Sequence, residues 1–321
     1  MRRVAFFLNP VLTERGQGRA VIERCAAILR DEGCVVEMED TLSARSAGDQ
    51  AREAVERGAD TVFACGGDGT FFQILQGVAG TSAAVGVIPF GTGNVLVQNL
   101  RLPRDPAAAF EAQRSAEAVP IPLGQVSSKA VGHLSERNWY FTIAAGMGIH
   151  AALMELSPNG SGKRLLGRAA YYSGGIRLLL AHPIQPFDVE VTGTDGAVRR
   201  FQACELLSVR VPEINRWRPG GNLESPELRM AAVPYTNRLG LTHAMFHAVI
   251  TRRNGRPASG PGLPYPQYEE AAKIKCRPAA GYSYKAPLLV EADGEIIGVE
   301  HATFKVAEKR VRLLWPGTRR S

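Results

Sequence analysis

The stretch Asp60–Thr70 constrains the fold of this 321-residue chain more than any other. It opens with the apolar run Thr61–Cys65, which suits a buried strand, and passes through Gly66-Gly67-Asp68-Gly69-Thr70 into Phe71–Leu75, which begins a helix. A glycine-rich turn between a strand and a helix brings backbone N–H groups close to a ligand, and the helix N-terminus favours anions. Phosphate is the expected ligand. Because Asp68 would repel bare phosphate, we also expect a magnesium ion.

A second stretch repeats this pattern. The apolar run Val85–Ile88 leads into Pro89-Phe90-Gly91-Thr92-Gly93-Asn94, and Val95–Val97 then begins a helix. Two such loops at the carboxyl ends of adjacent parallel strands form a crevice of the kind in which open α/β sheets bind ligands. The preceding chain fits such a sheet, because strands over 4–8 and 34–38 alternate with helices over 19–32 and 43–57.

The pattern changes after Pro120-Ile121-Pro122, which we interpret as a domain boundary. From Leu123 onward, short alternating runs separated by turn residues predict an antiparallel β domain. We therefore expect an α/β nucleotide-binding domain with a parallel sheet over residues 1–121, and an antiparallel all-β domain over residues 122–307. The final apolar run, Arg310–Trp315, predicts that residues 308–321 return to the first domain.

The two glycine motifs together resemble the catalytic domain of the diacylglycerol and sphingosine lipid kinases, bacterial members included. NAD kinases share the motif Gly66–Thr70 but not Pro89–Asn94, so the pair favours the lipid kinases. Gly146-Met147-Gly148 and Lys163–Tyr172, which fits a Lys-Arg-x-x-Gly-x-x-x-Tyr helix, extend the resemblance over most of the chain. The resemblance implies a lipid kinase that transfers the γ-phosphate of ATP to the hydroxyl of a diacylglycerol or sphingoid-like lipid.

A third motif, Asp293-Gly294-Glu295, lies between the apolar runs Leu288–Ala292 and Ile296–Ile297. Asp-Gly favours a type I′ turn, so the residues alone predict a two-residue hairpin. The motif also resembles the family's Asp-Gly-Glu, which presents carboxylates for catalysis. The resemblance favours Glu295 as the base that takes the proton of the lipid hydroxyl, and places Asp293 in the magnesium network. From geometry alone, these two roles are interchangeable.

The expected site therefore combines catalytic acids with nucleotide contacts, and its cofactors are ATP and Mg²⁺. Asp68 and Asp293 are the expected metal ligands, and both join Glu295 as catalytic residues. The residues expected to contact ATP are Asn9, Thr41, Gly66, Gly67, Asp68, Gly69, Thr70, Thr92 and Asn94. Taken alone, Asn9 could equally end a strand in a turn, and Thr41 would cap the helix that follows.

Two positions depart from the family pattern. Val95 stands where the family often has an aspartate of the magnesium network. Bacterial members often carry an acidic motif that holds a structural metal in the β domain, but the matching region, Pro212–Asn222, has Glu213 as its single acid. A non-catalytic nucleotide or lipid sensor is therefore the main alternative, and an NAD kinase is a weaker one.

The amino-acid composition limits the classes of partner that this chain is expected to bind. Lys and Arg exceed Asp and Glu by 38 − 31 = 7, which suits an anionic lipid surface. No basic run is interleaved with aromatic residues, so we expect no nucleic acid. The five cysteines lack metal-ligand spacing and predict reduced thiols in the cytosol. No apolar run is long enough for a transmembrane helix, and the apolar start reads as a first strand. We expect a cytoplasmic protein with transient, peripheral contact at the inner membrane face; the sequence permits a homodimer.

Two further features leave alternatives open. His243 and His247 could share a helix face, but with no third ligand nearby we interpret them as ordinary packed or surface histidines. The segment 242–250 could also form a strand. Residues 252–267 are rich in proline and glycine and predict a loop, which could be a mobile lid or an irregular excursion.

Overall fold

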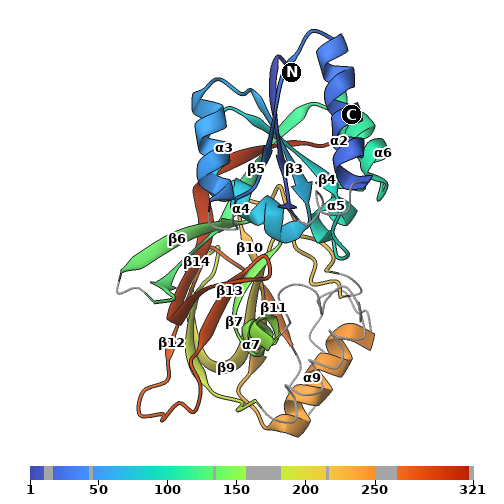
Figure 1. Cartoon of the computed structure of the whole chain (residues 1–321). Coiled ribbons are helices and arrows are strands. Elements are labelled where there is room, and N and C mark those ends of the chain that lie inside the picture. The colour runs from blue at the N-terminus through green and yellow to red at the C-terminus, as the bar shows by residue number, and fades with distance from the viewer. Residues whose placement is uncertain are drawn as a thin grey trace. The chain divides into compact units, whose positions relative to one another are not determined.

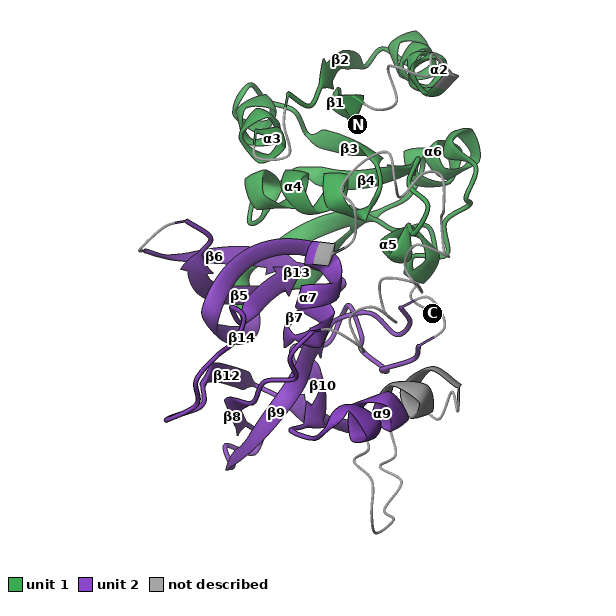
Figure 2. Cartoon of the chain, turned by 60° about the horizontal axis from the view of Figure 1, so that its bottom comes forward, with its two compact units in different colours: residues 1–123, 307–321 green, residues 124–306 purple. Residues whose placement is uncertain are grey.

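A computed structural model describes residues 1–10, 17–42, 46–132, 135–156, 182–214, 217–250 and 266–317. The chain divides into two compact units, Met1–Leu123 with Ala307–Ser321 (unit 1) and Gly124–Val306 (unit 2), coloured separately in Figure 2. These limits lie one or two residues from those expected. Both fall inside long strands, β5 (Ala118–Ala130) and β14 (Glu295–Leu314). Pro120-Ile121-Pro122 is therefore part of a strand at the boundary and does not form a separate linker.

Unit 1 is built on a parallel sheet. Its strands β1 (Arg3–Leu8), β2 (Val35–Asp40), β3 (Thr61–Gly66) and β4 (Ala84–Pro89) pair in parallel in the order β4–β3–β1–β2. The end of β14 pairs in parallel with β4, so the last run returns to this sheet. Every residue of β3 and β4 is buried, as expected for parallel strands covered on both faces.

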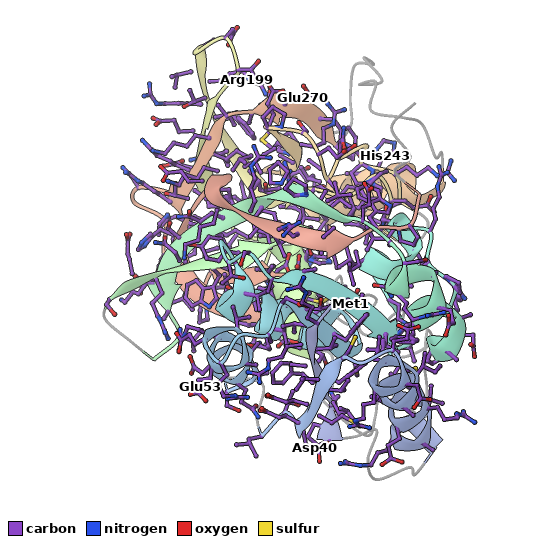
Figure 3. The ribbon with its side chains drawn as sticks, turned by 90° about the horizontal axis from the view of Figure 1, so that it is seen from above. Met1, Asp40, Glu53, Arg199, His243 and Glu270 are labelled. Carbon is purple, nitrogen blue, oxygen red and sulfur yellow. The ribbon has the colours of Figure 1, made fainter. Side chains whose placement is uncertain are left out.

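Helices cover both faces of this sheet (Figure 1). They are α2 (Gln17–Asp31), α3 (Ala47–Glu56), α4 (Asp68–Val78), α5 (Val95–Asn99) and α6 (Pro106–Arg114). Figure 1 shows α2 and α6 on one side and α3 and α4 on the other. The exposed acid Glu53 lies on the outward face of α3 (Figure 3).

The core beneath α2 and α6 is aromatic. Phe6 and Phe63, from neighbouring strands, stack with ring centroids 5.1 Å apart, and Phe110 of α6 lies 5.6 Å from Phe63. Apolar residues of α2 pack on the same cluster, which also includes Leu314 from the end of β14. Burial of these large side chains fixes the helices on the sheet, because each contributes about 1.5–3 kcal/mol when removed from water.

Unit 2 consists mainly of antiparallel strands. They are β6 (Glu136–Phe141), β7 (Ala144–Gly148), β8 (Phe187–Thr192), β9 (Val198–Val209), β10 (Leu228–Pro234), β11 (Gln267–Ala271), β12 (Lys273–Pro278) and β13 (Leu289–Ala292), together with most of β5 and β14. The pairings β5–β6, β7–β9, β7–β13, β8–β9, β8–β12, β9–β10, β10–β11, β12–β14 and β13–β14 are antiparallel. The expected order, an α/β domain and then a β-rich one, is confirmed.

Two helices correct the expectation of an all-β second domain. They are α7 (Ile149–Leu156) and α9 (Arg238–Ile250), so the strand considered for 242–250 is wrong. Both helices bury apolar residues in one cluster, which includes Leu153 of α7, Leu241 of α9 and Cys204 of β9. The continuous apolar composition of these segments hid their helical period, because a short apolar run fits either structure.

Two of the segments predicted from the sequence lie wholly or mostly outside the residues that the structure describes. The helix expected over Lys163–Tyr172 and nearly all of the loop 252–267 lie outside the described residues. Across the described helices, none combines the length and the apolarity needed to cross a bilayer. All five cysteines are free thiols, and four of them are buried.

Candidate functional site

The first glycine loop joins β3 directly to α4. Gly67 is the N-cap of α4 in an extended conformation (φ −103°, ψ −170°), and the N–H of Phe71 donates to the carbonyl of Gly67 over 3.1 Å. The N–H groups of the first helical residues before Phe71 have no carbonyl one turn earlier to bind. The loop thus presents a helix N-terminus at the carboxyl end of a parallel strand, which suits a phosphate.

The second glycine loop packs against the first, backbone to backbone. A Cβ atom on Gly91 would lie 2.8 Å from the Cα of Gly67 and 2.7 Å from the Oδ1 of Asn94. A Cβ atom on Gly66 would collide with the hydroxyl of Thr70. Glycine is therefore required at these positions by close approach, and the predicted crevice is built from touching loops.

Asp68 ties the two loops together. Its Oδ2 accepts the N–H of Val95 over 3.0 Å, and its Oδ1 accepts the N–H of Leu96 over 3.2 Å, so the carboxylate caps α5. Burial raises the pKa of Asp68, while these two N–H groups act in the opposite direction. Each oxygen keeps further acceptor capacity. The predicted role of Asp68 in binding magnesium stays a prediction, and its role as a cap was not anticipated.

The other expected nucleotide contacts of unit 1 lie at the same strand ends. The side-chain amide of Asn9 donates to the hydroxyl of Thr70 over 3.1 Å. The amide of Asn94, which has a left-handed backbone (φ 47°), donates to the carbonyl of Gly91 over 2.6 Å, and its Oδ1 has no hydrogen-bond partner among the described residues. Thr92 is exposed.

Thr41 follows β2, beside the end of β1. Its N–H and its hydroxyl both donate to the carbonyl of Leu8, over 2.8 and 3.2 Å. The interpretation of Thr41 as a helix cap is wrong, because Ser46 occupies the N-cap of α3. Its buried hydroxyl holds the strand end in place.

In unit 2, the predicted hairpin of Asp293 and Gly294 is confirmed. Ala292 pairs with Glu295, and the two turn residues have φ angles of 48° and 88°, as a type I′ turn requires. Glu295, the first residue of β14, is partly buried.

Asp293 occupies a different environment from the one expected. Its Oδ1 accepts the N–H groups of Ile143 and Ala144 over 2.8 and 3.0 Å, and its Oδ2 accepts the N–H and the hydroxyl of Thr142 over 3.0 and 3.2 Å. Four donors therefore saturate both oxygens of a side chain that is 8% exposed. Its carboxylate thus anchors the hairpin to the β6–β7 connection, and the expected role of Asp293 as a metal ligand and catalytic acid stays a prediction.

Burial raises the pKa of Asp293 to about 7, against the opposing effect of its three backbone donors. The described residues contain no group of three or more His, Cys, Asp or Glu side chains that could hold a metal ion. His243, on α9 (Figure 3), belongs to no such group. A magnesium ion would therefore depend on ligands supplied by a bound nucleotide as well as by this chain.

A buried network of charged side chains lies behind the hairpin. Glu291 of β13 is 1% exposed, and its Oε2 accepts the N–H of Gly294 over 3.0 Å. Its Oε1 lies 3.4 Å from the Nδ1 of His150, and the Oε2 of Glu205 accepts the backbone N–H of His150 over 2.7 Å. Burial lowers the pKa of His150, but the contact with Glu291 and the charge of Glu205 outweigh it, so the pKa lies above its usual value.

Residues 3–126 match the family model of the diacylglycerol kinase catalytic domain. The resemblance drawn from the glycine motifs is thus confirmed. The matched segment contains every nucleotide contact expected from the sequence, whereas Asp293 and Glu295 lie beyond it.

Curated relatives carry kinase names at low identity. A protein of Cronobacter sakazakii (strain ATCC BAA-894) named "Probable lipid kinase YegS-like" is 28% identical over 42% of this chain and 44% of its own. The diacylglycerol kinase of Bacillus subtilis (strain 168) is 31% identical over 60% of this chain and 59% of its own. The chain thus spans about half the length of these relatives.

Solved structures resemble the chain over nearly its whole length. A diacylglycerol kinase from Bacillus anthracis str. Sterne superposes with a TM-score of 0.62 at 16% identity, covering 98% of this chain and 97% of its own. Another solved chain from the same organism reaches a TM-score of 0.70 at 18% identity with the same coverage. At such identities the likeness establishes the fold alone.

The region that matches the family's structural-metal motif lies beside a buried guanidinium. Arg210, at the end of β9, donates to the carbonyl oxygens of Leu223, Ser225 and Glu227 over 2.9, 2.8 and 2.5 Å. Burial lowers the pKa of Arg210 to about 10, so it stays protonated at neutral pH. Glu213, the single acid of the region, forms a 3.0 Å ion pair with Arg218. The acid and the carbonyl groups are thus already bound by arginines.

Sequence reasoning missed four functional candidates: Glu291, His150, Glu205 and Arg210. Glu291 lies two positions before Asp293, the first residue of the Asp-Gly-Glu motif, and an acid inside an apolar strand was the available signal. No local sequence pattern identifies His150, Glu205 or Arg210 as candidates, because their partners lie on segments distant in sequence.

Proposed function

We propose that this chain is an ATP-dependent lipid kinase, which transfers the γ-phosphate of ATP to the hydroxyl of a diacylglycerol or sphingoid-like lipid. The observation that carries the proposal is the pair of touching glycine loops, joined by Asp68 at the carboxyl ends of parallel strands. That pair lies inside the segment that matches the diacylglycerol kinase catalytic domain. Phosphoryl transfer depends mainly on positioning and charge neutralisation, which such loops supply.

ATP fits the residues of unit 1. The N–H groups at the start of α4 would bind its phosphates, and Asn9, Thr41, Thr92 and Asn94 would contact the nucleotide. Bound Mg²⁺ would neutralise charge on the phosphates. Magnesium in such sites commonly takes one or two carboxylates together with substrate phosphates and waters. Asp68 can supply one carboxylate, because its oxygens keep acceptor capacity beyond the two N–H groups that they bind.

Glu295 is the residue to which we assign the base. Asp293, the other acid of the hairpin motif, already binds four donors, which supports Glu295 over Asp293 as the base. A carboxylate at this position would take the proton of the lipid hydroxyl, and such positioned bases contribute about 10²–10⁴-fold to rate.

The partners follow from this activity. The lipid substrate requires contact with a membrane surface, which the excess of basic residues favours. We propose transient, peripheral binding at the inner membrane face from the cytoplasm, with no role for nucleic acid. A homodimer is compatible with this scheme and is tested by the mass of the protein in solution.

The test is phosphorylation of lipids by the purified protein. Labelled ATP and magnesium are incubated with vesicles that contain diacylglycerol, sphingoid, ceramide or phosphatidylglycerol acceptors, and a labelled lipid is expected. Glu295→Gln should lower turnover by about 10²–10⁴-fold with ATP affinity unchanged. Glu300→Gln is the matched control, since Glu300 is an exposed acid of the same strand paired with Lys129. The absence of labelled product from every acceptor would contradict the proposal.

One observation favours a second candidate, a nucleotide or lipid sensor without catalysis. Val95 stands where the family often has an acid of the magnesium network. A sensor would bind ATP without magnesium-dependent turnover of any lipid in the panel. Formation of NADP from NAD and ATP, above the lipid activity, would instead indicate an NAD kinase.

A further inference from the structure

The tip of the β13–β14 hairpin is held from two sides. On one side, the carboxylate of Asp293 binds three N–H groups and one hydroxyl of the β6–β7 connection. On the other, the carboxylate of Glu291 accepts the N–H of Gly294 over 3.0 Å. Glycine otherwise has a wide choice of backbone angles, so this bond restricts the residue that immediately precedes Glu295.

Glu291 is itself held by His150. The two side chains approach to 3.4 Å, and both atoms of that contact, His150 Nδ1 and Glu291 Oε1, are buried without a hydrogen-bond partner among the described residues. A carboxylate that is 1% exposed needs a compensating partner, because burying an unpaired charge is strongly unfavourable. His150 is the basic side chain in contact with it.

The position of His150 is fixed in turn by its helix. His150 lies in the first turn of α7, where its backbone N–H donates to Glu205 of β9 over 2.7 Å. Leu153 of the same helix is buried in the apolar cluster with Cys204, which precedes Glu205. A continuous path of contacts therefore runs from β9 through α7 and Glu291 to the hairpin tip.

We propose that His150 and Glu291 are positioning residues, which fix the hairpin tip and thereby orient the side chain of Glu295 for proton removal. The orientation of Glu295 toward a substrate rests on the proposed kinase activity, whereas the restraint on the tip does not. Neither residue needs to touch the lipid or the nucleotide. Glu205 supports the pair by anchoring the start of α7.

The restraint is tested without any substrate, by hydrogen–deuterium exchange of peptides that cover residues 289–298. Glu291→Ala removes the acceptor of the Gly294 N–H, and His150→Gln removes the imidazole in contact with Glu291. Both should accelerate exchange at the tip by about tenfold or more, while exchange in unit 1 stays at the wild-type rate. His301→Gln is the matched control, because His301 pairs with Glu136 over 2.7 Å on an exposed part of β14. Unchanged exchange in both test variants would overturn the proposal.

The consequence for catalysis is tested with the same variants. His150→Gln should lower kcat by about 10- to 100-fold with the KM for ATP unchanged, since misplacement of a catalytic group acts on the chemical step. Glu291→Gln keeps an oxygen that can accept the N–H of Gly294, so it should recover part of the kcat lost in Glu291→Ala. Equal losses in Glu291→Gln and Glu291→Ala, with melting temperatures lowered in parallel, would indicate a merely structural role and overturn the catalytic part.

Failure of the proposed function is distinguishable from failure of this inference. If the wild-type protein labels no lipid, the kinase proposal fails, and the exchange measurement still decides whether His150 and Glu291 hold the tip. If a variant does not fold, the remaining variant decides, because each removes a different member of the contact pair.

Discussion

At the scale of single residues, the buried carboxylate of Glu205 should make the free energy of unfolding depend on pH. Burial of its carboxylate raises its pKa from 4.5 to about 8. Between these values the folded protein binds more protons than the unfolded chain, so the free energy of unfolding should fall as pH rises from about 4.5 to 8. Asp293, whose pKa is raised to about 7, acts with the same sign.

The substitution Glu205→Gln removes one of these two contributions. Urea unfolding at pH 5 and pH 8 should show a smaller loss of stability between the two pH values in the variant than in the wild type. An equal loss in both proteins would show that Glu205 does not titrate in this range.

From the hydrogen bonds of Arg210, we expect that unit 2 does not need a metal ion for its stability. Its guanidinium binds three carbonyl groups, so Arg210→Met would leave them buried without donors and should cost about 3 kcal/mol or more. Arg218→Met is the control, because Arg218 is exposed and its ion pair should contribute less than about 1 kcal/mol. Chelation with EDTA should leave the melting temperature of the wild type unchanged. A lower melting temperature with EDTA would reveal a structural metal.

Individual residues also show which features of the candidate site could be predicted from the sequence and which could not. The glycines of both loops and the Asp-Gly turn could be predicted, because each reflects a local backbone requirement. The role of Asp293 could not, because its four donors come from Thr142–Ala144, far away in sequence. A carboxylate looks the same in sequence whether it binds a metal or a backbone.

At the scale of elements, α3 and α4 cross at a point where both helices carry glycine. A Cβ atom on Gly77 would overlap the carbonyl of Gly48, and a Cβ atom on Gly48 would lie 2.7 Å from the carbonyl of Gln73. This contact could not be predicted, because a glycine inside a helical pattern indicates only a position of low helix propensity.

The substitution Gly77→Ala should therefore lower the stability of the protein, whereas a change from glycine to alanine in a helix usually raises it. In an exposed helix, alanine stabilises by about 1 kcal/mol relative to glycine, but here it should destabilise by about 2 kcal/mol because the helices must separate. Chemical denaturation measures the difference. Gly317→Ala, where no atom lies within 4 Å of the added methyl group, should stay close to the wild type. A gain in stability for Gly77→Ala would exclude the close crossing.

The contact between the two glycine loops gives a second prediction for an element. Gly91→Ala would push its methyl group onto Gly67, so it should weaken ATP binding by about tenfold or more and lower stability. In Gly93→Ala, the nearest atom is the Oδ2 of Asp68 at 3.4 Å, so its stability should be close to that of the wild type. Calorimetric titration with ATP and thermal melting measure the two effects. If Gly91→Ala binds ATP with the wild-type affinity, the second glycine loop does not take part in ATP binding.

The elements that the sequence predicted best are those with a clear period. The strand β8 belongs to the short alternating runs that predicted the antiparallel domain, since its apolar and polar residues alternate strictly. The helix α7 was not expected, and for 242–250 a helix and a strand were both left open, because these mostly apolar segments carry no clear period.

At the scale of the whole chain, the last strand completes the first unit. Arg312 and Leu313 pair with Ala84 and Val85 of β4, and Leu314 packs in the aromatic core. A protein made of residues 1–123 alone should therefore fail to fold cooperatively. Joining 307–321 to it through a flexible linker should restore a cooperative thermal transition, measured by circular dichroism. A cooperative transition of residues 1–123 by themselves would contradict this prediction.

The passage of β5 and β14 through both unit boundaries has a consequence for biosynthesis. The ribosome makes the first four strands of the parallel sheet early, but it makes the strand that borders β4 only after the whole second unit has been translated. Until then the backbone of β4 carries an unpaired edge, which can join other nascent chains. The first unit thus reaches its finished form only after the second unit has been translated, so a cell in which translation stalls within the second unit accumulates a chain with an exposed β-sheet edge.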